Sequence, residues 1–117
     1  IAGRKCAKQN SVEEVAAATL RVLKRCVPSA VPGIAFLSGG QSDEEATAHL
    51  SAMNAMGPLP WGLTFSYGRA LQAAPQKAWS GKAENVPAGQ KAFAHRARMN
   101  SLASLGKWSP AEEKKAA

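Results

Sequence analysis

Residues 36–45 read FLSGGQSDEE. This stretch starts inside the apolar run GIAFL of residues 33–37 and then passes through one serine and two glycines. A short apolar run that is closed by glycines is typical of a strand buried on both faces. Ser42 and Glu45 form an S-x-x-E capping box, which begins a helix, and the acids between them favour the positive end of that helix. The stretch therefore predicts a strand, a glycine turn and a helix in direct succession.

The same order recurs about 30 residues further along the chain. In WGLTFSYGR, residues 61–69, apolar and polar side chains alternate from Leu63 to Tyr67, which predicts a second strand, and the composition becomes helical from Ala70. Two successive strand–helix units predict an α/β protein with a parallel sheet. Two parallel strands alone leave open edges, so we expect them to pair with further strands from elsewhere.

Helices are also predicted on either side of these units. Ser11 and Glu14 form another capping box, ahead of an amphipathic helix that ends at Val27. Near the other end, we expect Asn85 to cap a helix that runs to Gly106, where a glycine is a plausible stop.

Two features interrupt or end the helical pattern. Pro75 lies several residues into the helix after the second strand, where proline costs about 3 kcal/mol, so we expect a break or kink there. The tail SPAEEKKAA, residues 109–117, is polar and is expected to fray. The chain is therefore divided into a folded unit, residues 1–108, and a polar tail, residues 109–117.

Length and composition fit one soluble globular domain, with 117 residues, of which 45% are hydrophobic and 20% charged. The longest apolar stretch, residues 30–37, is far shorter than the roughly 20 residues that span a bilayer, so no membrane span is predicted. Cys6 and Cys26 lack the spacing of a metal site. We expect two reduced, buried thiols rather than a disulfide.

The formal net charge of +7 is unevenly distributed. Lys and Arg against Asp and Glu give +4 for residues 1–30, −2 for residues 31–74 and +5 for residues 75–117. The basic residues are scattered along predicted helices and form no run with interleaved aromatic residues. Solvated helix faces explain this pattern better than nucleic acid binding does.

Both predicted turns have features of an anion site. Gly39 and Gly40 leave their backbone N–H groups unshielded, Ser38 adds a hydroxyl, and the next helix aims its positive end at the turn. In the second turn, Arg69 offers a planar guanidinium that matches a phosphate dianion. Ligands of parallel α/β proteins bind at the carboxyl ends of strands, so we expect the turns to converge on a phosphate site. The alternative is that the glycines only make the corner and that Arg69 is a surface ion pair.

The sequence resembles the C-terminal part of class I fructose-bisphosphate aldolase, from about Gly3 to Trp108. The most specific likeness lies in VPGIAFLSGGQSDEEATAHLSAMN, residues 31–54, and PWGLTFSYGRALQAAPQKAW, residues 60–79. The family is an eight-stranded βα barrel, usually a tetramer, that cleaves fructose 1,6-bisphosphate through a lysine Schiff base. The resemblance implies an α/β fold made of the C-terminal βα units of a TIM (β/α)8 barrel, incomplete alone, with about two strands and three to four helices.

The resemblance also implies a role for both turns. They would follow the seventh and eighth strands of the barrel and bind a substrate phosphate through Ser38, Gly39, Gly40, Ser66, Gly68 and Arg69. The expected ligand is fructose 1,6-bisphosphate or dihydroxyacetone phosphate, bound once further strands or chains complete the barrel. The resemblance implies no cofactor and no metal, and a cytoplasmic or plastid location.

Several catalytic parts of the family have no counterpart in these residues. The Schiff-base lysine would lie just ahead of the region that matches Ile1, and AEEKKAA stands where the family's tail closes with a tyrosine. A Schiff-base lysine needs burial or a cationic neighbour to lower its pKa, whereas every lysine here lies in a polar or helical context. His49 and His95 lie in helices without an acid or nucleophile at triad spacing. We therefore expect no catalytic residue in this chain and no aldolase activity from the chain alone.

Two functions remain open from the sequence. The first is a part of a glycolytic or Calvin-cycle aldolase that contributes the phosphate-binding turns without a nucleophile. The second is a non-catalytic, aldolase-derived structural or accessory subunit of a larger organellar assembly. The basic charge and Pro75 fit the second interpretation, because a surface that packs on an acidic partner needs no barrel.

Overall fold

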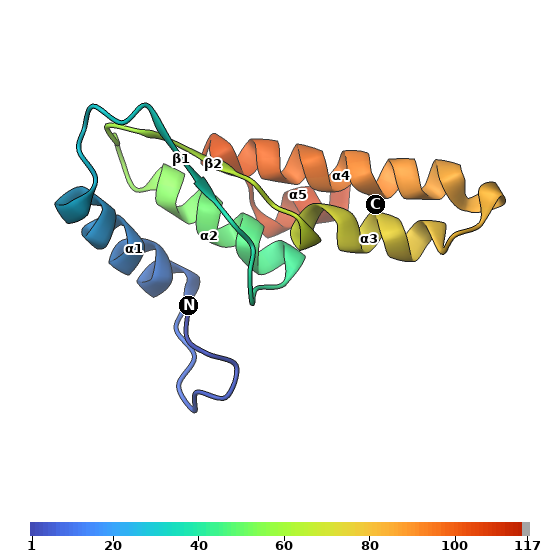
Figure 1. Cartoon of the computed structure of the whole chain (residues 1–117), viewed down its shortest axis with the longest axis horizontal. Helices are drawn as coiled ribbons and strands as arrows, with labels where there is room; N and C mark the ends of the chain where they lie inside the picture. The colour runs from blue at the N-terminus through green and yellow to red at the C-terminus, as the bar shows by residue number, and fades with distance from the viewer. Residues whose placement is uncertain (116–117) are drawn as a thin grey trace.

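The computed structural model describes residues 1–115, which form a two-stranded parallel sheet and helices packed against it (Figure 1). The predicted order helix, strand, helix, strand, helix is confirmed, with further helices after it. In chain order the elements are α1 (Val12–Cys26), β1 (Gly33–Phe36), α2 (Asp43–Ala55), β2 (Gly62–Phe65), α3 (Arg69–Trp79), the 3-10 helix η1 (Ala83–Asn85), α4 (Val86–Ser104) and α5 (Pro110–Lys115).

Strands β1 and β2 pair in parallel, with Gly33 opposite Gly62 and Phe36 opposite Phe65. The pairing continues past the strand ends, because the N–H of Ser66 donates to the carbonyl oxygen of Phe36 at 2.8 Å. A Cβ at Gly33 would lie only 3.3 Å from the carbonyl oxygen of Gly62, so glycine permits this close approach. The carboxyl ends of both strands lie at the same end of the sheet, and the loops that follow the strands start there.

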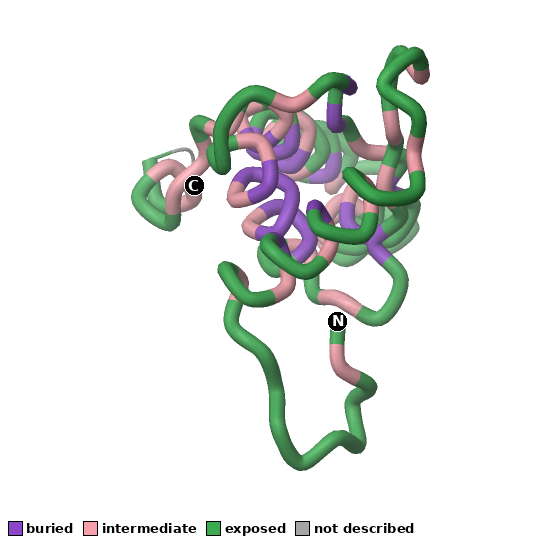
Figure 2. Tube along the Cα trace, turned by 90° about the vertical axis from the view of Figure 1, so that its left-hand side faces the viewer, coloured by how far each residue is buried: buried purple, intermediate pink, exposed green. Residues whose placement is uncertain are grey.

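Helix α2 forms the centre of the core. It contacts α1, α3, α4 and β2, and Leu50 at its middle is fully buried. The Asn54 amide donates to the carbonyl oxygens of Leu63 and Ala103, at 3.3 and 3.1 Å, which ties α2 to β2 and α4. Figure 2 shows the buried residues gathered in the middle of the molecule, with an exposed N-terminal segment hanging away from it.

The prediction that the first strand is buried on both faces is wrong. Ile34 and Phe36 are half-buried, whereas Gly33 and Ala35 are exposed. Successive residues of a strand point to opposite faces, so only one face of β1 is covered within the described residues. The radius of gyration, 15.4 Å, also exceeds the roughly 13 Å of a compact domain of this length. This openness agrees with the expectation that the sheet needs further strands.

The predicted helix caps are confirmed at the N-termini of α1 and α2. Ser11 Oγ accepts the N–H of Glu14 at 3.2 Å, and Glu14 Oε2 accepts the N–H of Ser11 at 2.9 Å. At α4 the prediction holds in position only, because Asn85 occupies the cap without a side-chain hydrogen bond. Gly106, with a φ of 66°, follows the end of α4 as expected.

The expected break at Pro75 is absent, since α3 runs unbroken through this residue. Proline has no N–H to donate, so one intrahelical hydrogen bond is lost. Helix α3 packs closely on α4 in this region. A Cβ on Gly89 would lie 3.1 Å from Trp79 Cβ and 3.4 Å from the carbonyl oxygen of Pro75, so glycine lets the two helix backbones approach closely.

Two further predictions differ from the structure. Residues 110–115, which were expected to fray, form helix α5, and contacts of Glu113 hold it on α4. The last two residues of the predicted tail, 116–117, lie outside the described residues.

Cys6 and Cys26 are free thiols, as predicted, but both are exposed, because one lies in the N-terminal segment and the other ends α1. None of the described helices is long and apolar enough to cross a membrane.

Candidate phosphate site

The two turns that were predicted to bind phosphate follow the carboxyl ends of β1 and β2, at the same end of the sheet (Figure 1). The SGG turn, residues 37–42, joins β1 to α2, and the YGR turn, residues 66–69, joins β2 to α3 and includes the first residue of α3. A hydrogen bond links the two regions directly, from the N–H of Ala70 to Ser38 Oγ at 3.4 Å. All six predicted residues therefore lie on two linked turns.

The SGG turn combines a buried hydroxyl with exposed backbone. Ser38 is 7% exposed, whereas Gly39 and Gly40 are exposed. Gly40 has a φ of 78°, a conformation that favours glycine. The N–H groups of Gly39 and Gly40 have no hydrogen-bond partner among residues 1–115, so they are able to donate to a ligand.

The N-terminus of α2, which follows the SGG turn, is satisfied by its own side chains. Ser42 Oγ accepts the N–H of Glu45 at 3.1 Å, and Glu45 Oε2 accepts the N–H of Ser42 at 2.8 Å. The hydrogen bond from the Ser42 backbone holds the pKa of Glu45 below its usual value. Asp43 and Glu44 add further negative charge to this first helical turn. The negative charge of these acids compensates the positive partial charge at the N-terminus of the helix. An added anion is therefore disfavoured there.

The N-terminus of α3, in the YGR turn, is the opposite case. Gly68 occupies the cap position without a side-chain hydrogen bond, and no acid lies in the first turn of the helix. Arg69 is exposed, and so is Ser66. The N–H groups of Gly68 and Arg69 have no partner within the described part of the chain. Two unpaired N–H groups, a positive helix end and a guanidinium together suit a phosphate dianion.

Tyr67 holds the YGR turn on α2, a contact that the sequence did not reveal. The side chain is 6% exposed, and its hydroxyl donates to the carbonyl oxygen of Ala46 at 2.8 Å. Burial raises the pKa of Tyr67 to about 12. The alternation from Leu63 to Tyr67 predicted a strand, but nothing in the sequence identified Ala46 as the partner of the Tyr67 hydroxyl.

Neither His49 nor any lysine is placed as an activated nucleophile near the two turns. His49 Nδ1 lies 2.7 Å from Gln41 Oε1, and burial lowers the pKa of this histidine. Every lysine of the chain is exposed. Within residues 1–115, no group of three or more His, Cys, Asp or Glu residues is placed to hold a metal ion.

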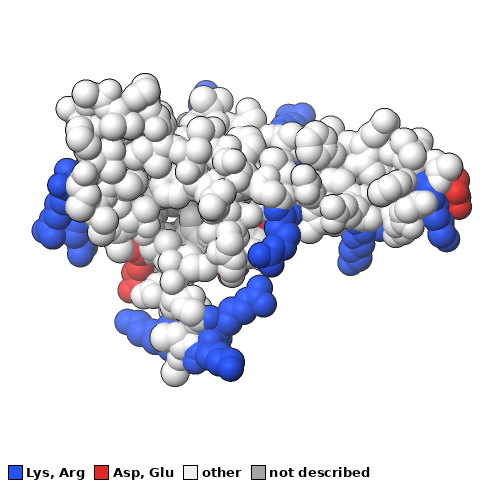
Figure 3. Space-filling view, in the orientation of Figure 1, with Lys and Arg blue, Asp and Glu red and all other residues white. Residues whose placement is uncertain are grey.

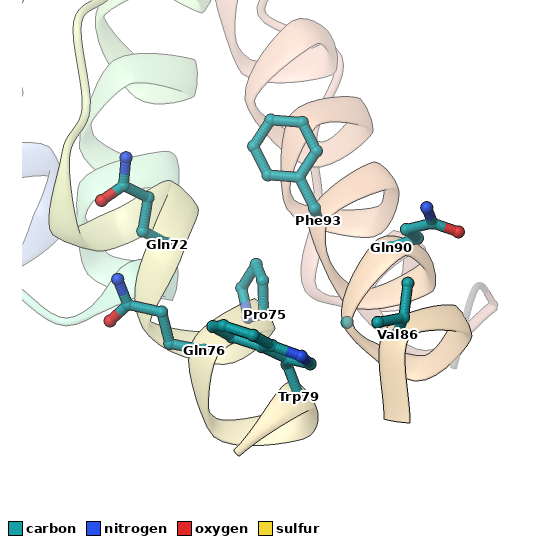
Figure 4. Close-up of a pocket in the computed structure, with 8 residues that line it drawn as sticks. Gln72, Pro75, Gln76, Trp79, Val86, Gln90 and Phe93 are labelled. Atoms are coloured by element: carbon teal, nitrogen blue, oxygen red, sulfur yellow. The ribbon is translucent and has the colours of Figure 1, made fainter. Parts of the chain in front are cut away.

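Two hollows lie near these elements. A partly polar hollow of about 520 Å³ adjoins the SGG turn, and its lining includes Gly40, Gln41 and Arg4. A mainly apolar groove of about 340 Å³ lies between α3 and α4, and Figure 4 shows Trp79 and Phe93 on its two sides. All residues that line this groove are uncharged, so it lacks the groups that bind phosphate.

The basic side chains do not gather into one patch on the face shown in Figure 3. Lysine and arginine lie there in separate groups around the outline of the molecule, most of them on its lower side and at its two ends. Most of the face between them is uncharged. This arrangement agrees with the scattered basic residues of the sequence.

Comparison with known proteins shows which family the chain belongs to. The whole chain, residues 1–117, matches the family described as fructose-bisphosphate aldolase class-I. It is 51% identical over 107 residues to fructose-bisphosphate aldolase of Plasmodium falciparum (isolate K1 / Thailand), covering 92% of this chain and 30% of that protein. It is 57% identical over 108 residues to fructose-bisphosphate aldolase B of Gallus gallus, again covering 92% and 30%. The chain thus spans about 30% of the length of these curated relatives.

A solved structure gives the same result. The chain is similar to fructose-bisphosphate aldolase from Plasmodium falciparum, solved in complex with TRAP and a small molecule inhibitor, with a TM-score of 0.90 and 51% identity. The match covers 92% of this chain and 31% of that one. The predicted fold is confirmed, because the described residues form βα units of an incomplete (β/α)8 barrel with two parallel strands. The resemblance seen in the sequence is also confirmed, and the chain belongs to the class I fructose-bisphosphate aldolase family.

Proposed function

We propose that this chain provides substrate phosphate-binding turns of a class I fructose-bisphosphate aldolase. The observation that supports this most is Arg69 at the uncapped N-terminus of α3, beside the SGG turn. A substrate phosphate would accept hydrogen bonds from the Arg69 guanidinium and from unpaired N–H groups of Gly68, Gly39 and Gly40. These contacts would fix one end of fructose 1,6-bisphosphate or dihydroxyacetone phosphate.

In this proposal, the chain binds and orients, and the bond cleavage occurs elsewhere. The family cleaves fructose 1,6-bisphosphate to dihydroxyacetone phosphate and glyceraldehyde 3-phosphate through a Schiff base on a lysine. That lysine must be partly neutral, which requires burial or a cationic neighbour. Because every lysine of residues 1–117 is exposed, the nucleophile would be a lysine outside these residues. Further strands would also complete the barrel around the site.

The experiment is a titration of the protein, at its natural length, with fructose 1,6-bisphosphate. We expect binding that inorganic phosphate competes away and free fructose does not. Arg69→Ala should weaken binding by about tenfold or more, because hydrogen bonds to charged groups contribute about 1.5–3 kcal/mol. Arg98→Ala is the matched control, since Arg98 is exposed on α4 and the charge change is the same. Equal affinities for wild type and Arg69→Ala would refute the proposed role of Arg69.

A second experiment tests where the nucleophile lies. Borohydride is added with dihydroxyacetone phosphate, and the modified lysine is mapped by mass spectrometry. We expect no adduct on any lysine of residues 1–117, because all of them are in contact with water. A stoichiometric adduct on one of them would contradict the division of roles proposed here.

The alternative is an aldolase-derived accessory subunit without catalytic function, in an organellar assembly. The basic net charge of +7 is the feature that favours it, since such a surface suits an acidic protein partner. The titration separates the two functions. Specific binding of sugar phosphate favours the aldolase, whether cytoplasmic or plastid. If the protein at its natural length does not bind sugar phosphate, the accessory subunit is favoured.

A further inference from the structure

A hydrogen bond joins the SGG turn to the middle of α2, and the proposed function does not yet use it. His49 Nδ1 lies 2.7 Å from Gln41 Oε1, in a residue eight positions earlier in the chain. An amide oxygen only accepts hydrogen bonds, so the hydrogen of this bond belongs to His49 Nδ1. His49 is 9% exposed, and Gln41 is half-buried. The contact is therefore largely shielded from water, at the end of the turn that leads into α2.

Gln41 also closes the SGG turn through its backbone. Its N–H donates to the carbonyl oxygen of Ser38 at 3.1 Å, which makes Gly39 and Gly40 the central residues of a β-turn. Glycine has more backbone freedom than any other residue, so two central glycines do not fix a turn by themselves. The directions of the Gly39 and Gly40 N–H groups therefore depend on how the two ends of the turn are held.

Different parts of the molecule hold these two ends. At the first end, the Ser38 hydroxyl accepts the N–H of Ala70 at 3.4 Å, which is a contact with the second strand–helix unit. At the other end, His49 holds the side chain of Gln41. His49 lies on the central helix of the core, next to the fully buried Leu50, so its own position is well fixed.

Hollow space borders the contact between His49 and Gln41. Both residues line the partly polar hollow of about 520 Å³ that adjoins the SGG turn. Both also line a second hollow of about 140 Å³, together with Phe36 and Tyr67. Packing therefore constrains the Gln41 side chain less than it constrains a core residue, and the hydrogen bond from His49 supplies the missing constraint.

The protonation of His49 agrees with this geometry. Burial lowers the pKa of His49, and the opposing effect of Glu45, one helical turn earlier, is smaller. The pKa lies below its usual value, so the imidazole is neutral at pH 7 and carries one hydrogen. The bond to Gln41 places this hydrogen on Nδ1, which fixes one tautomer.

We propose that His49 is a positioning residue for phosphate binding, which acts through Gln41 to fix the direction of the Gly39 and Gly40 N–H groups. The inference rests on the proposed function, because it needs a phosphate beside the SGG turn. His49 itself bonds to Gln41 and not to the ligand. The chain thus carries a support for the turn in the core helix, in addition to the groups that bind the phosphate.

The test measures the affinity for fructose 1,6-bisphosphate by calorimetry at neutral pH, in the protein at its natural length. His49→Leu removes the donor and should weaken binding by about three- to tenfold, because the turn loses one of its two supports. His49→Asn should stay within about twofold of the wild type, since Asn Nδ2, like His Nδ1, is a donor bonded to Cγ. His49→Gln carries its donor one bond further out and should bind as weakly as His49→Leu.

A double-mutant cycle with Gln41 separates positioning from a general loss of structure. Gln41→Leu should weaken binding as much as His49→Leu does, because either change breaks the same contact. In the Gln41→Leu variant, His49→Leu should have no further effect on affinity, since the residue through which His49 acts is already absent. Thermal unfolding of each variant checks that it is folded at the temperature of the titration.

Arg69→Ala separates a failure of this inference from a failure of the proposed function. Wild-type affinity in His49→Leu, beside a clear loss in Arg69→Ala, would overturn the inference and leave the proposed function intact. Equal losses in His49→Leu and His49→Asn, or additive losses with Gln41→Leu, would also overturn it, because His49 would then act by packing alone. If Arg69→Ala binds as tightly as the wild type, the proposed function fails and this inference fails with it.

Discussion

The two strand–helix units of this chain have the same plan, yet their helices begin in opposite ways. Helix α2 starts with a complete capping box and three acids. Helix α3 starts with Gly68, without a cap bond or an acid, and with Arg69 as its first residue. A helix N-terminus whose N–H groups are capped by side chains, with acids beside it, stabilises the fold. A helix N-terminus with unpaired N–H groups beside a cation is suited to bind an anion.

The two helices also differ in what they bury. Helix α2 has six buried residues, from Ala46 to Met53, whereas Ala70 is the buried residue of α3. The SGG turn therefore precedes the helix that builds the core, and the YGR turn precedes a helix at its margin. Under the proposed function, the first unit would mainly supply stability and the second unit would mainly supply affinity for phosphate.

The largest expected effect is the loss of a buried core side chain in the first strand–helix unit. Leu50→Ala removes a fully buried side chain of α2 and should lower the free energy of unfolding by about 2–5 kcal/mol. Leu71→Ala, the matched change in α3, removes a partly buried side chain and should cost about 1–2 kcal/mol. Urea unfolding measures both. Equal losses would contradict the difference between the two helices.

A smaller effect is expected within the SGG turn. Gly40→Ala places a side chain at a φ of 78°, which should cost about 1–2 kcal/mol in the free energy of unfolding. Gly39→Ala is the control, because a Cβ there meets nothing within 4 Å, and it should cost less than about 0.5 kcal/mol. If the two variants unfold at the same urea concentration, the turn does not need the conformation of Gly40.

The smallest effect concerns the contact that joins the units. Tyr67→Phe removes the hydrogen bond to the carbonyl oxygen of Ala46 and should cost about 1 kcal/mol near neutral pH. Because the pKa of Tyr67 is about 12 in the folded chain, above its usual 10, its stabilising effect is complete below pH 10. It is lost as the pH rises from 10 towards 12.

The Phe variant lacks this contribution, so thermal unfolding of both proteins across that pH range checks the prediction. Tyr67 is the only tyrosine of the chain, which keeps other phenols out of the comparison. Identical pH dependence of the wild type and the variant would show that Tyr67 ionisation is not linked to folding.

Much of the fold follows from local signals in the sequence. The S-x-x-E boxes at Ser11 and Ser42 predict both helix starts, because each cap involves residues only three apart. The burial of β1 and the unbroken α3 were not predictable in this way. They depend on which faces other elements cover and on how closely α4 approaches Pro75 through Gly89.

The candidate site shows the same limit. Glycines and Arg69 in the two turns, together with the rule for strand ends, predicted that the turns would meet, and the bond from Ala70 to Ser38 agrees. The contact of Tyr67 with Ala46 and that of Glu113 with Arg96 join residues 21 and 17 positions apart. No spacing rule connects such residues, so the tail looked like a polar segment that would fray.

The most direct test of the account compares the two helix starts as phosphate sites. Inorganic phosphate is titrated into Arg69→Ala and Asp43→Asn by calorimetry, with the wild type as reference. We predict that Arg69→Ala weakens binding by about tenfold or more, whereas Asp43→Asn changes it by less than about twofold or strengthens it. Unchanged binding in Arg69→Ala, or an equal loss in both variants, would contradict the assignment of phosphate affinity to the second turn.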